Sequence, residues 1–211
     1  MAIQTHHSLR VGGIVLCGGQ SRRMGRPKAW LPFREETMLG RVVCLLGEAV
    51  SPIVAVAAPD QDVPPLPDSV RIVRDEEKGR GPLQGLLAGL TALDGRADAA
   101  YVSSCDVPFL QPRFIGRLVE LLGDSMICMP YVGGYYHSLA AIYRIGVRNA
   151  VGRLLAENRL RPYFLCEMVP TRVVQADELV DVDPTLQSLR NLNAPEEYEA
   201  ALRDAAGNEA L

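Results

Sequence analysis

Apolar residues along this chain fall into two patterns, short runs of strand length and longer stretches with helical spacing. The runs occupy residues 13–17, 53–58, 70–74 and 98–104. Short, strongly apolar runs are typical of strands that are buried on both faces of a parallel sheet. These segments therefore predict the central strands of an α/β fold.

Helical spacing fills two of the gaps between these runs. Thr37 is a suitable N-cap for a helix to about Val50, in which apolar residues recur every three or four positions. Pro82 suits the first turn of a second helix that ends near Leu93. The proline-rich segment 59–68 predicts a surface loop between two strands. This alternation predicts a mostly parallel sheet with helices on both faces.

The second half of the chain continues the alternation with less regularity. The expected elements are a helix over 112–122, strands over 126–130 and 137–143, helices over 147–157 and 161–168, and a terminal helix from Pro195. Gly133 and Gly134 predict the turn between the two strands. Residues 173–176 and 179–183 predict a small edge β pair outside the main sheet. We therefore predict a single-domain, three-layer αβα Rossmann-like sandwich with a mostly parallel sheet.

Length and composition agree with one soluble domain. The chain has 211 residues, which is enough to bury a sizeable core, and no linker divides it. A net charge of -3 and a pI near 5.7 argue against a nucleic-acid partner, because such proteins usually carry a basic face. No run reaches the ~18 apolar residues of a membrane span.

The N-terminus and the cysteines indicate the compartment. Residues 1–10 contain no apolar signal segment, so we expect a disordered tail, with a metal site at His6 and His7 as a weaker alternative. The cysteines are odd in number and lack C-x-x-C spacing, which argues against a zinc site and against a disulfide framework. We expect a cytoplasmic protein, with Cys17, Cys105 and Cys128 as buried thiols.

The segment from Ile14 to Lys28 carries most of the chemistry. It is an apolar strand that ends in Gly18 and Gly19 and is followed by a loop with several cations, which are Arg22, Arg23, Arg26 and Lys28. Glycines let a ligand approach the backbone, and exposed amides with positive charge suit a polyphosphate. A Walker A loop and a dinucleotide fingerprint are both excluded, because Gly-Lys-Ser/Thr and G-x-G-x-x-G are absent here.

A second candidate group is Asp106, which directly follows the strand over 98–104 and precedes Pro108. In open α/β sheets this edge binds ligands, so Asp106 is expected to face the same crevice as the glycine loop. One or two carboxylates together with phosphate oxygens are the usual ligands of Mg²⁺. The alternative is that Asp106 caps the next helix, although Pro112 is the better start for that helix.

The pattern G-G-x-S-x-R-M-G-x-x-K, from Gly18 to Lys28, resembles the signature of the small-molecule nucleotidyltransferases, and most of all that of the molybdenum cofactor guanylyltransferases. Two further segments match this family. The first is G-P-L-x-G, from Gly81 to Gly85, and the second is N-x-N-x-P-E-E, from Asn191 to Glu197. The resemblance extends over nearly the whole chain, from Gly13 to about Leu202.

This resemblance implies a fold of the nucleotide-diphospho-sugar transferase type and a Mg²⁺-dependent transfer of GMP. The donor is GTP, the acceptor is the phosphate of Mo-molybdopterin, and pyrophosphate is released. Residues 11–110 would form the nucleotide-binding half and 111–202 the acceptor-binding half of a single domain, 1–211. Transient contact with molybdoenzymes or their chaperones is also implied.

The resemblance further implies roles for individual residues. The catalytic residues would be Arg23, Lys28 and Asp106, and Asp106 would also hold the metal. Nucleotide binding would involve Leu16, Cys17, Gly18, Gly19, Lys28, Asp75, Gly81, Pro82 and Asp106. Acceptor binding would involve Arg23, Asn191 and Asn193. The family often has a polar residue after the second strand where this chain has Ala57-Ala58-Pro59. Guanine recognition is therefore expected from backbone groups or from Asp75, an acceptor for the N1 and N2 donors.

Several alternatives stay open at this point. A sister enzyme with the same chemistry would transfer CMP to molybdopterin or act on a sugar or polyol phosphate. A nucleotide-binding module without activity, such as a chaperone for a molybdoenzyme, is a third possibility, although Lys28 and Asp106 argue against it. Asn193 is either an acceptor-binding residue or a simple Asx turn or cap. His137 is either a substrate contact or an ordinary interior histidine.

Overall fold

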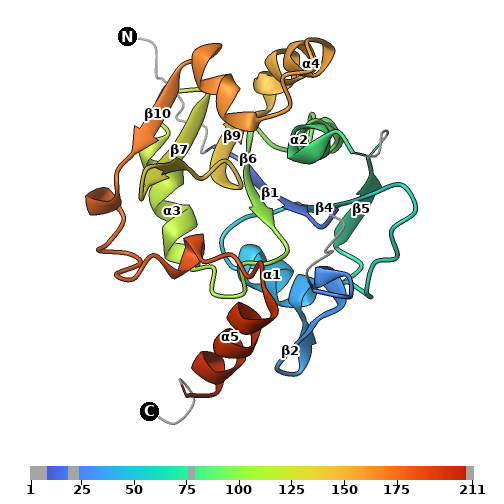
Figure 1. Cartoon of the computed structure of the whole chain (residues 1–211). Coiled ribbons are helices and arrows are strands. Elements are labelled where there is room, and N and C mark those ends of the chain that lie inside the picture. Colours follow the sequence, from blue (N-terminus) through green and yellow to red (C-terminus); the bar gives the residue numbers. More distant parts are fainter. Residues whose placement is uncertain (1–8, 19–23, 76–78, 208–211) are drawn as a thin grey trace.

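The computed structural model describes residues 9–18, 24–75 and 79–207 (Figure 1). Its centre is an eight-stranded sheet in the order β10-β7-β9-β6-β1-β4-β5, with β8 paired to β7 off this path. The strands are β1 (Val11–Leu16), β4 (Ile53–Ala57), β5 (Val70–Arg74), β6 (Ala99–Ser104), β7 (Ile127–Val132), β8 (Tyr135–Tyr136), β9 (Ala140–Arg144) and β10 (Thr171–Val174). The predicted mostly parallel sheet is confirmed, and β9 runs antiparallel to both of its neighbours.

The helices cover both faces of this sheet. They are α1 (Met38–Gly47), α2 (Gly81–Ala92), α3 (Pro112–Leu121), α4 (Arg148–Ala156) and α5 (Pro195–Gly207). Short 3-10 helices occupy Lys28–Trp30, Ile145–Val147, Pro162–Glu167, Ala176–Glu178 and Gln187–Leu189. The five helices start within two residues of the positions that the sequence predicts, and Thr37 Oγ1 accepts the Gly40 N–H, as expected of an N-cap.

The alternation of side chains along β1 explains why its sequence is apolar throughout. Val15 and Cys17 belong to the core cluster that contains α1 and α3, whereas Ile14 and Leu16 belong to the cluster that contains α2 and α4. Because both faces are covered, every position of the strand after Val11 is buried. The three-layer architecture thus follows from the apolar runs.

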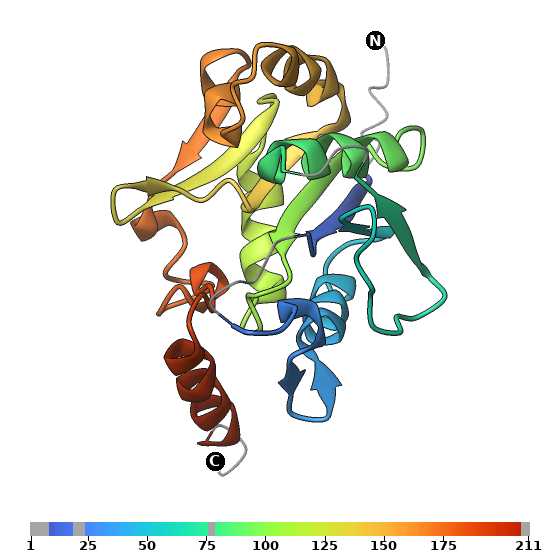
Figure 2. The same ribbon diagram turned by 45° about the vertical axis from the view of Figure 1, so that its right-hand side comes forward.

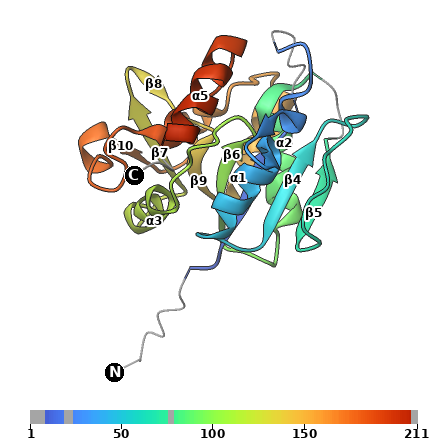
Figure 3. The same cartoon turned by 90° about the horizontal axis from the view of Figure 1, so that it is seen from below.

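A smaller apolar cluster attaches the C-terminal helix. It joins α5 to α1 and to a hairpin of β2 (Pro32–Phe33) and β3 (Glu36–Thr37) through Leu31, Phe33, Met38, Leu192, Ala201 and Ala205. Figure 3 shows α5 on the same side of the sheet as α1. This packing fixes the segment that immediately precedes α5.

Two predictions need correction. The first half of the expected edge pair is β10, which joins the main sheet parallel to β7, and the second half contains no strand. The edge of β7 was free to accept a strand, so 171–174 pairs there instead of with its sequence neighbour. Arg10, which we placed in the N-terminal tail, is tied to Asp98 through both its backbone and its guanidinium. Residues 1–8, including His6 and His7, lie outside the described residues.

The hairpin at Gly133 and Gly134 is confirmed, and both glycines have positive φ. The strand predicted over 137–143 is β9, which begins at Ala140, and the short strand β8 precedes the predicted range. Within the described residues, no helix is long and apolar enough to cross a membrane.

Candidate active site

A cavity of about 1000 Å³ opens at the carboxyl-terminal edge of β1, β4 and β6. Its lining brings together most of the described residues that the sequence singles out, namely Leu16, Cys17, Gly18, Lys28, Asp75, Gly81, Pro82, Asp106, Asn191 and Asn193. In Figure 2 the segment that leads into α5 lies below the sheet, beside the segment that follows β6. Parallel strands deliver their carboxyl ends to one edge, which is why residues far apart in sequence meet here.

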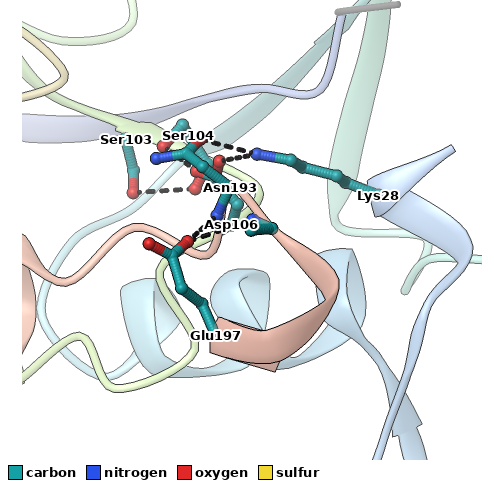
Figure 4. Close-up of polar contacts among 7 residues, drawn as sticks. Lys28, Ser103, Ser104, Asp106, Asn193 and Glu197 are labelled. Atoms are coloured by element: carbon teal, nitrogen blue, oxygen red, sulfur yellow. Dashed lines mark hydrogen bonds and ion pairs between the residues drawn. The ribbon is translucent and has the colours of Figure 1, made fainter. Parts of the chain in front are cut away.

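At one end of the cavity, Lys28 joins two segments that are remote in sequence (Figure 4). Its Nζ lies 2.6 Å from Asp106 Oδ2 and 2.9 Å from Asn193 Oδ1. The side chains of Lys28 and Asp106 are only 17% and 10% exposed, so their ion pair is shielded from solvent. We refer to Lys28, Asp106 and Asn193 as the Lys28 end.

Hydrogen bonds hold both the side chain and the backbone carbonyl of Asp106. Ser104 donates a hydroxyl hydrogen bond of 2.5 Å to Asp106 Oδ1, and Leu192 N donates to the Asp106 carbonyl at 2.9 Å. The N-cap of α3 is Gln111. The capping alternative for Asp106 is therefore wrong, and its carboxylate faces the cavity.

The capping alternative for Asn193 is also answered by its contacts. Its side-chain oxygen accepts from Lys28, while Glu197 Oε2 accepts the backbone N–H groups of Asn193 and Ala194. These bonds satisfy amides at the start of α5 and lower the pKa of Glu197. Glu197 thus caps the helix, which leaves the Asn193 carboxamide available to Lys28.

At the other end of the cavity lies Asp75, directly after β5. Its backbone N–H donates to Ala57 O at 2.9 Å, whereas its Oδ1 is buried and has no hydrogen-bond partner among the described residues. Burial raises the pKa of Asp75 to about 6. A buried acceptor without a partner is costly in a resting protein and is available to the donors of a ligand.

Two glycines make room around this carboxylate. A Cβ on Gly85 would lie 3.2 Å from Leu16 Cδ2 and 3.5 Å from Asp75 Oδ1, and one on Gly18 would lie 3.9 Å from Asp75 Oδ2. Side chains at these positions would fill the space in front of Asp75. We refer to Gly18, Asp75, Gly85 and the adjacent Gln61 as the Asp75 end.

The remaining predicted nucleotide positions border this end. Gly81, with φ of 68°, and Pro82 are exposed at the N-terminus of α2, whose free amides suit an anion or a polar ligand. Cys17 is buried, its thiol donates to Val56 O at 3.0 Å, and burial raises its pKa to about 12. It is therefore a neutral thiol and not a nucleophile.

A family profile described as the MobA-like NTP transferase domain matches residues 13–170. The chain belongs to the MobA-like NTP transferase family. A relative from Mycobacterium avium, named "Probable molybdenum cofactor guanylyltransferase", is 41% identical over 154 residues, which cover 71% of this chain and 77% of the relative. A relative of the same name from Mycobacterium ulcerans is 34% identical over 209 residues, covering 96% and 98%.

A solved structure has the same fold. "Molybdopterin-guanine dinucleotide biosynthesis protein A" from Archaeoglobus fulgidus has a TM-score of 0.74 at 19% identity and covers 93% of this chain and 99% of its own. At this identity the likeness shows the fold alone. The predicted αβα sandwich and the family resemblance predicted from the sequence are both confirmed.

Two predicted site residues of this MobA-like domain, Gly19 and Arg23, lie outside the described residues. Asn191 lines the cavity beside Asn193. His137 lies against its own hairpin: its backbone N–H donates to Pro130 O at 2.9 Å, and its Nε2 lies 3.3 Å from Val132 O. Burial lowers the pKa of His137. These contacts favour the reading of an ordinary interior histidine.

The sequence missed three residues of the MobA-like site, namely Gln61, Ser104 and the capping role of Glu197. Ser104 could have been found as a polar residue at the end of a buried strand, two positions before Asp106. Gln61 gave no such signal, because it lies in the proline-rich segment that we interpreted only as a surface loop. Its side chain is nevertheless bonded to Cys17 O and Ala58 N.

No cluster of three or more His, Cys, Asp and Glu side chains able to hold a metal occurs in the described parts of the chain. Mg²⁺ at phosphate-transfer sites is usually held by one or two carboxylates plus substrate oxygens. Asp106, with the Ser104 hydroxyl and the Asn193 carboxamide close by, offers hard oxygen donors of this kind. The donor set at the Lys28 end fits such an ion.

Proposed function

We propose that this protein transfers GMP from GTP to the terminal phosphate of Mo-molybdopterin, with release of pyrophosphate, to form a molybdopterin guanine dinucleotide cofactor. The observation that carries the proposal is the contact of Lys28 with Asp106 and Asn193 at one end of a large cavity. Membership of the MobA-like family and relatives named as guanylyltransferases support the substrates.

The reaction is a displacement at phosphorus. An oxygen of the acceptor phosphate forms a bond to the α-phosphorus of GTP, and the bond between that phosphorus and the bridging oxygen to the β-phosphate breaks. Pyrophosphate leaves with the electron pair. A phosphate monoester is already an anion at neutral pH, since its second pKa is about 6. The protein therefore needs no general base, and alignment and charge suffice.

The Lys28 end supplies the charge. The Lys28 ammonium is held by Asp106 and Asn193 at a fixed position, from which it can meet a phosphate oxygen. Asp106 would hold Mg²⁺, and the bound ion would neutralise charge on the triphosphate. The Gly18 and Gly19 amides and Arg23 add donors along the same loop. A carboxylate at the Asp75 end would repel phosphate, so the triphosphate occupies the Lys28 end.

The Asp75 end receives the base. Guanine presents N–H donors at N1 and N2, and the unpaired Asp75 Oδ1 is an acceptor. Leu16, Cys17, Gly81 and Pro82 complete the nucleotide contacts. Residues 11–110 thus act as the nucleotide half.

The acceptor enters from the other half of the chain, 111–202. Asn191 and Asn193 lie in the segment before α5 and reach the cavity that Lys28 also lines. Together with Arg23 they orient the acceptor phosphate. The product is passed on by transient contact with a molybdoenzyme or its chaperone. The five cysteines are free thiols, in keeping with a cytoplasmic location.

Calorimetric titration of the purified protein with GTP, CTP, ATP and UTP in the presence of Mg²⁺ tests the nucleotide assignment without the labile pterin. We expect selective binding of GTP. Selective binding of CTP would instead indicate a cytidylyltransferase, and no binding of any of the four would overturn the enzymatic reading. Pyrophosphate release with GTP and molybdopterin then tests the transfer itself.

A further inference from the structure

The strands β1 and β4 separate just where they reach the cavity. In this parallel pair Gly13 N donates to Pro52 O and Cys17 N donates to Val56 O, both at 2.9 Å. The register, with Leu16 opposite Val56, calls for the next bond to run from Ala58 N to Cys17 O. That bond is replaced.

The side chain of Gln61 takes its place. Ala58 N donates to Gln61 Oε1 at 3.1 Å, and Gln61 Nε2 donates to Cys17 O at 2.7 Å. The two bonds require a donor on one side and an acceptor on the other, so they fix which way the carboxamide points. Gln61 is a wedge that holds the two strand ends apart by the width of an amide group.

The turn that carries Gln61 is itself restrained. Gln61 N donates to Ala58 O at 3.1 Å, and the Arg74 guanidinium donates to Ala58 O at 3.0 Å and also to Gln61 O. Trp30 Nε1 donates to Asp62 O at 3.1 Å. The position of the carboxamide is thus set before any ligand arrives, which lowers the cost of using it in recognition.

Gln61 lines the cavity together with Gly18 and Asp75. A carboxamide nitrogen has two hydrogens, and the bond to Cys17 O uses one of them. The second hydrogen has no partner among the described residues. The Asp75 end therefore combines a free N–H donor on Gln61 with a free acceptor on Asp75.

We propose that Gln61 is a specificity-determining residue that selects guanine by donating its free N–H to O6, while Asp75 accepts from N1 and N2. Guanine carries this acceptor next to donors, whereas adenine carries a donor at N6 and an acceptor at N1. With adenine, the N6 donor would face the Gln61 donor and the N1 acceptor would face the Asp75 acceptor. This inference rests on the proposed nucleotidyl transfer and names its base contacts.

Replacement of Gln61 by Met tests the donor, because Met has a similar length and makes no amide hydrogen bond. We expect kcat/KM for GTP to fall about tenfold through KM, with the low rate for ATP unchanged, so that the GTP-to-ATP preference falls by the same factor. The variant Q111M removes a glutamine at the start of α3, away from the cavity, and serves as the control.

A change in the ligand distinguishes a contact of Gln61 with the base from a purely structural role of Gln61 between the strand ends. Sulfur at position 6 is a weak acceptor, so the wild-type protein should prefer GTP to 6-thio-GTP, and Q61M should lose that preference. Equal losses for GTP, ATP and 6-thio-GTP in a Q61M protein of lowered Tm would show that Gln61 acts only on the fold and would overturn the inference. Q61E, which keeps the acceptor for Ala58 N but lacks the donor, should also lose the preference.

The outcome for the wild-type protein distinguishes this inference from the proposed function. If wild-type protein selects GTP and Q61M selects it equally well, the role of Gln61 is wrong and the guanylyltransferase reaction stands. If wild-type protein shows no preference for GTP, the proposed function is wrong and the inference fails with it.

Discussion

The two ends of the cavity differ in whether their charged groups have hydrogen-bond partners. At the Lys28 end the charges satisfy one another: the Lys28 ammonium bonds both Asp106 and Asn193, and Ser104 bonds the second oxygen of Asp106. At the Asp75 end a carboxylate oxygen is buried without a partner in the described structure. The Lys28 end holds its groups in place for a charged ligand. The Asp75 end leaves an unpaired acceptor that only a hydrogen-bond donor can satisfy.

This difference has an energetic side. An ion pair that is shielded from water is costly to disrupt by removing one member, because the other charge is left uncompensated. A buried carboxylate oxygen without a partner, as at Asp75 Oδ1, already carries part of that cost in the resting protein. Substitutions at the Lys28 end should therefore harm activity and stability together, whereas those at the Asp75 end should separate the two.

The largest effect is expected from Asp106→Asn, which removes the charge and keeps the shape. We expect transfer to fall by about 1000-fold, because a charge-bearing group at the reacting phosphates is lost. The Asp106 carbonyl still accepts from Leu192 N, so the protein should still fold, but with a lower Tm because Lys28 loses its counter-charge. Pyrophosphate release measures the rate and circular dichroism checks the fold. Turnover within a few-fold of wild type would remove Asp106 from the metal and phosphate site.

The next effect is expected from Lys28→Met, which removes the ammonium from between Asp106 and Asn193. We expect GTP affinity to fall about 30-fold, equivalent to about 2 kcal/mol, because a charge-assisted contact to the triphosphate is lost. Calorimetry measures this change. The matched control is Arg96→Met, an exposed cation that follows α2. Equal GTP binding by the Lys28 and Arg96 variants would place Lys28 outside the phosphate site.

Asp75→Asn tests the other end and should separate stability from binding. The substitution removes the charge of a half-buried carboxylate whose Oδ1 has no partner among the described residues, so we expect the free energy of unfolding at pH 7.5 to rise by about 1 kcal/mol. GTP binding should weaken about tenfold, because one acceptor becomes a donor. Thermal unfolding and calorimetry measure the two effects. A variant that is less stable than wild type would contradict the conclusion that Asp75 Oδ1 has no partner in the free protein.

The pH dependence of GTP binding provides an independent test of Asp75. Burial raises its pKa to about 6, so the carboxyl is protonated below that pH and is then a poorer acceptor. Affinity should therefore rise between pH 5 and pH 7 in wild-type protein. The phosphates of GTP also titrate in this pH range. The pH profile of the Asp75→Asn variant shows their effect on affinity without that of Asp75. Identical pH profiles for the two proteins would show that Asp75 does not meet the base.

The smallest effect is expected from Asn193→Ala. Lys28 keeps its ion pair with Asp106, so we expect GTP affinity to fall only about threefold through the loss of one hydrogen bond. The KM for the acceptor should rise more than the KM for GTP, because Asn193 lies on the acceptor half. Steady-state kinetics separate the two constants, with Asn149→Ala, an exposed position in α4, as the control. A larger loss of GTP affinity than in Lys28→Met would reverse the ranking of these residues.

Much of the fold was predictable, because local patterns control it. The apolar runs gave the strands, Thr37 and the prolines gave helix starts, and Gly133 and Gly134 gave a turn. The predicted edge pair was wrong because strand pairing depends on residues distant in sequence: 171–174 pairs with β7, and residues 179–183 form no strand. Alternation of apolar and polar residues predicts a strand but does not determine which strand it pairs with.

The sequence by itself determined the strand and helix order, the resemblance to a nucleotidyltransferase family, and the residue types available for phosphate and metal. Only the tertiary structure decided which of them meet. Lys28 is 78 positions from Asp106 and 165 from Asn193, and sheet topology brings the three into contact. The wedge of Gln61 and the unpaired oxygen of Asp75 were likewise decided by packing. Hydrogen-bond partners and burial depend on neighbours that are distant in sequence, and no local pattern encodes them.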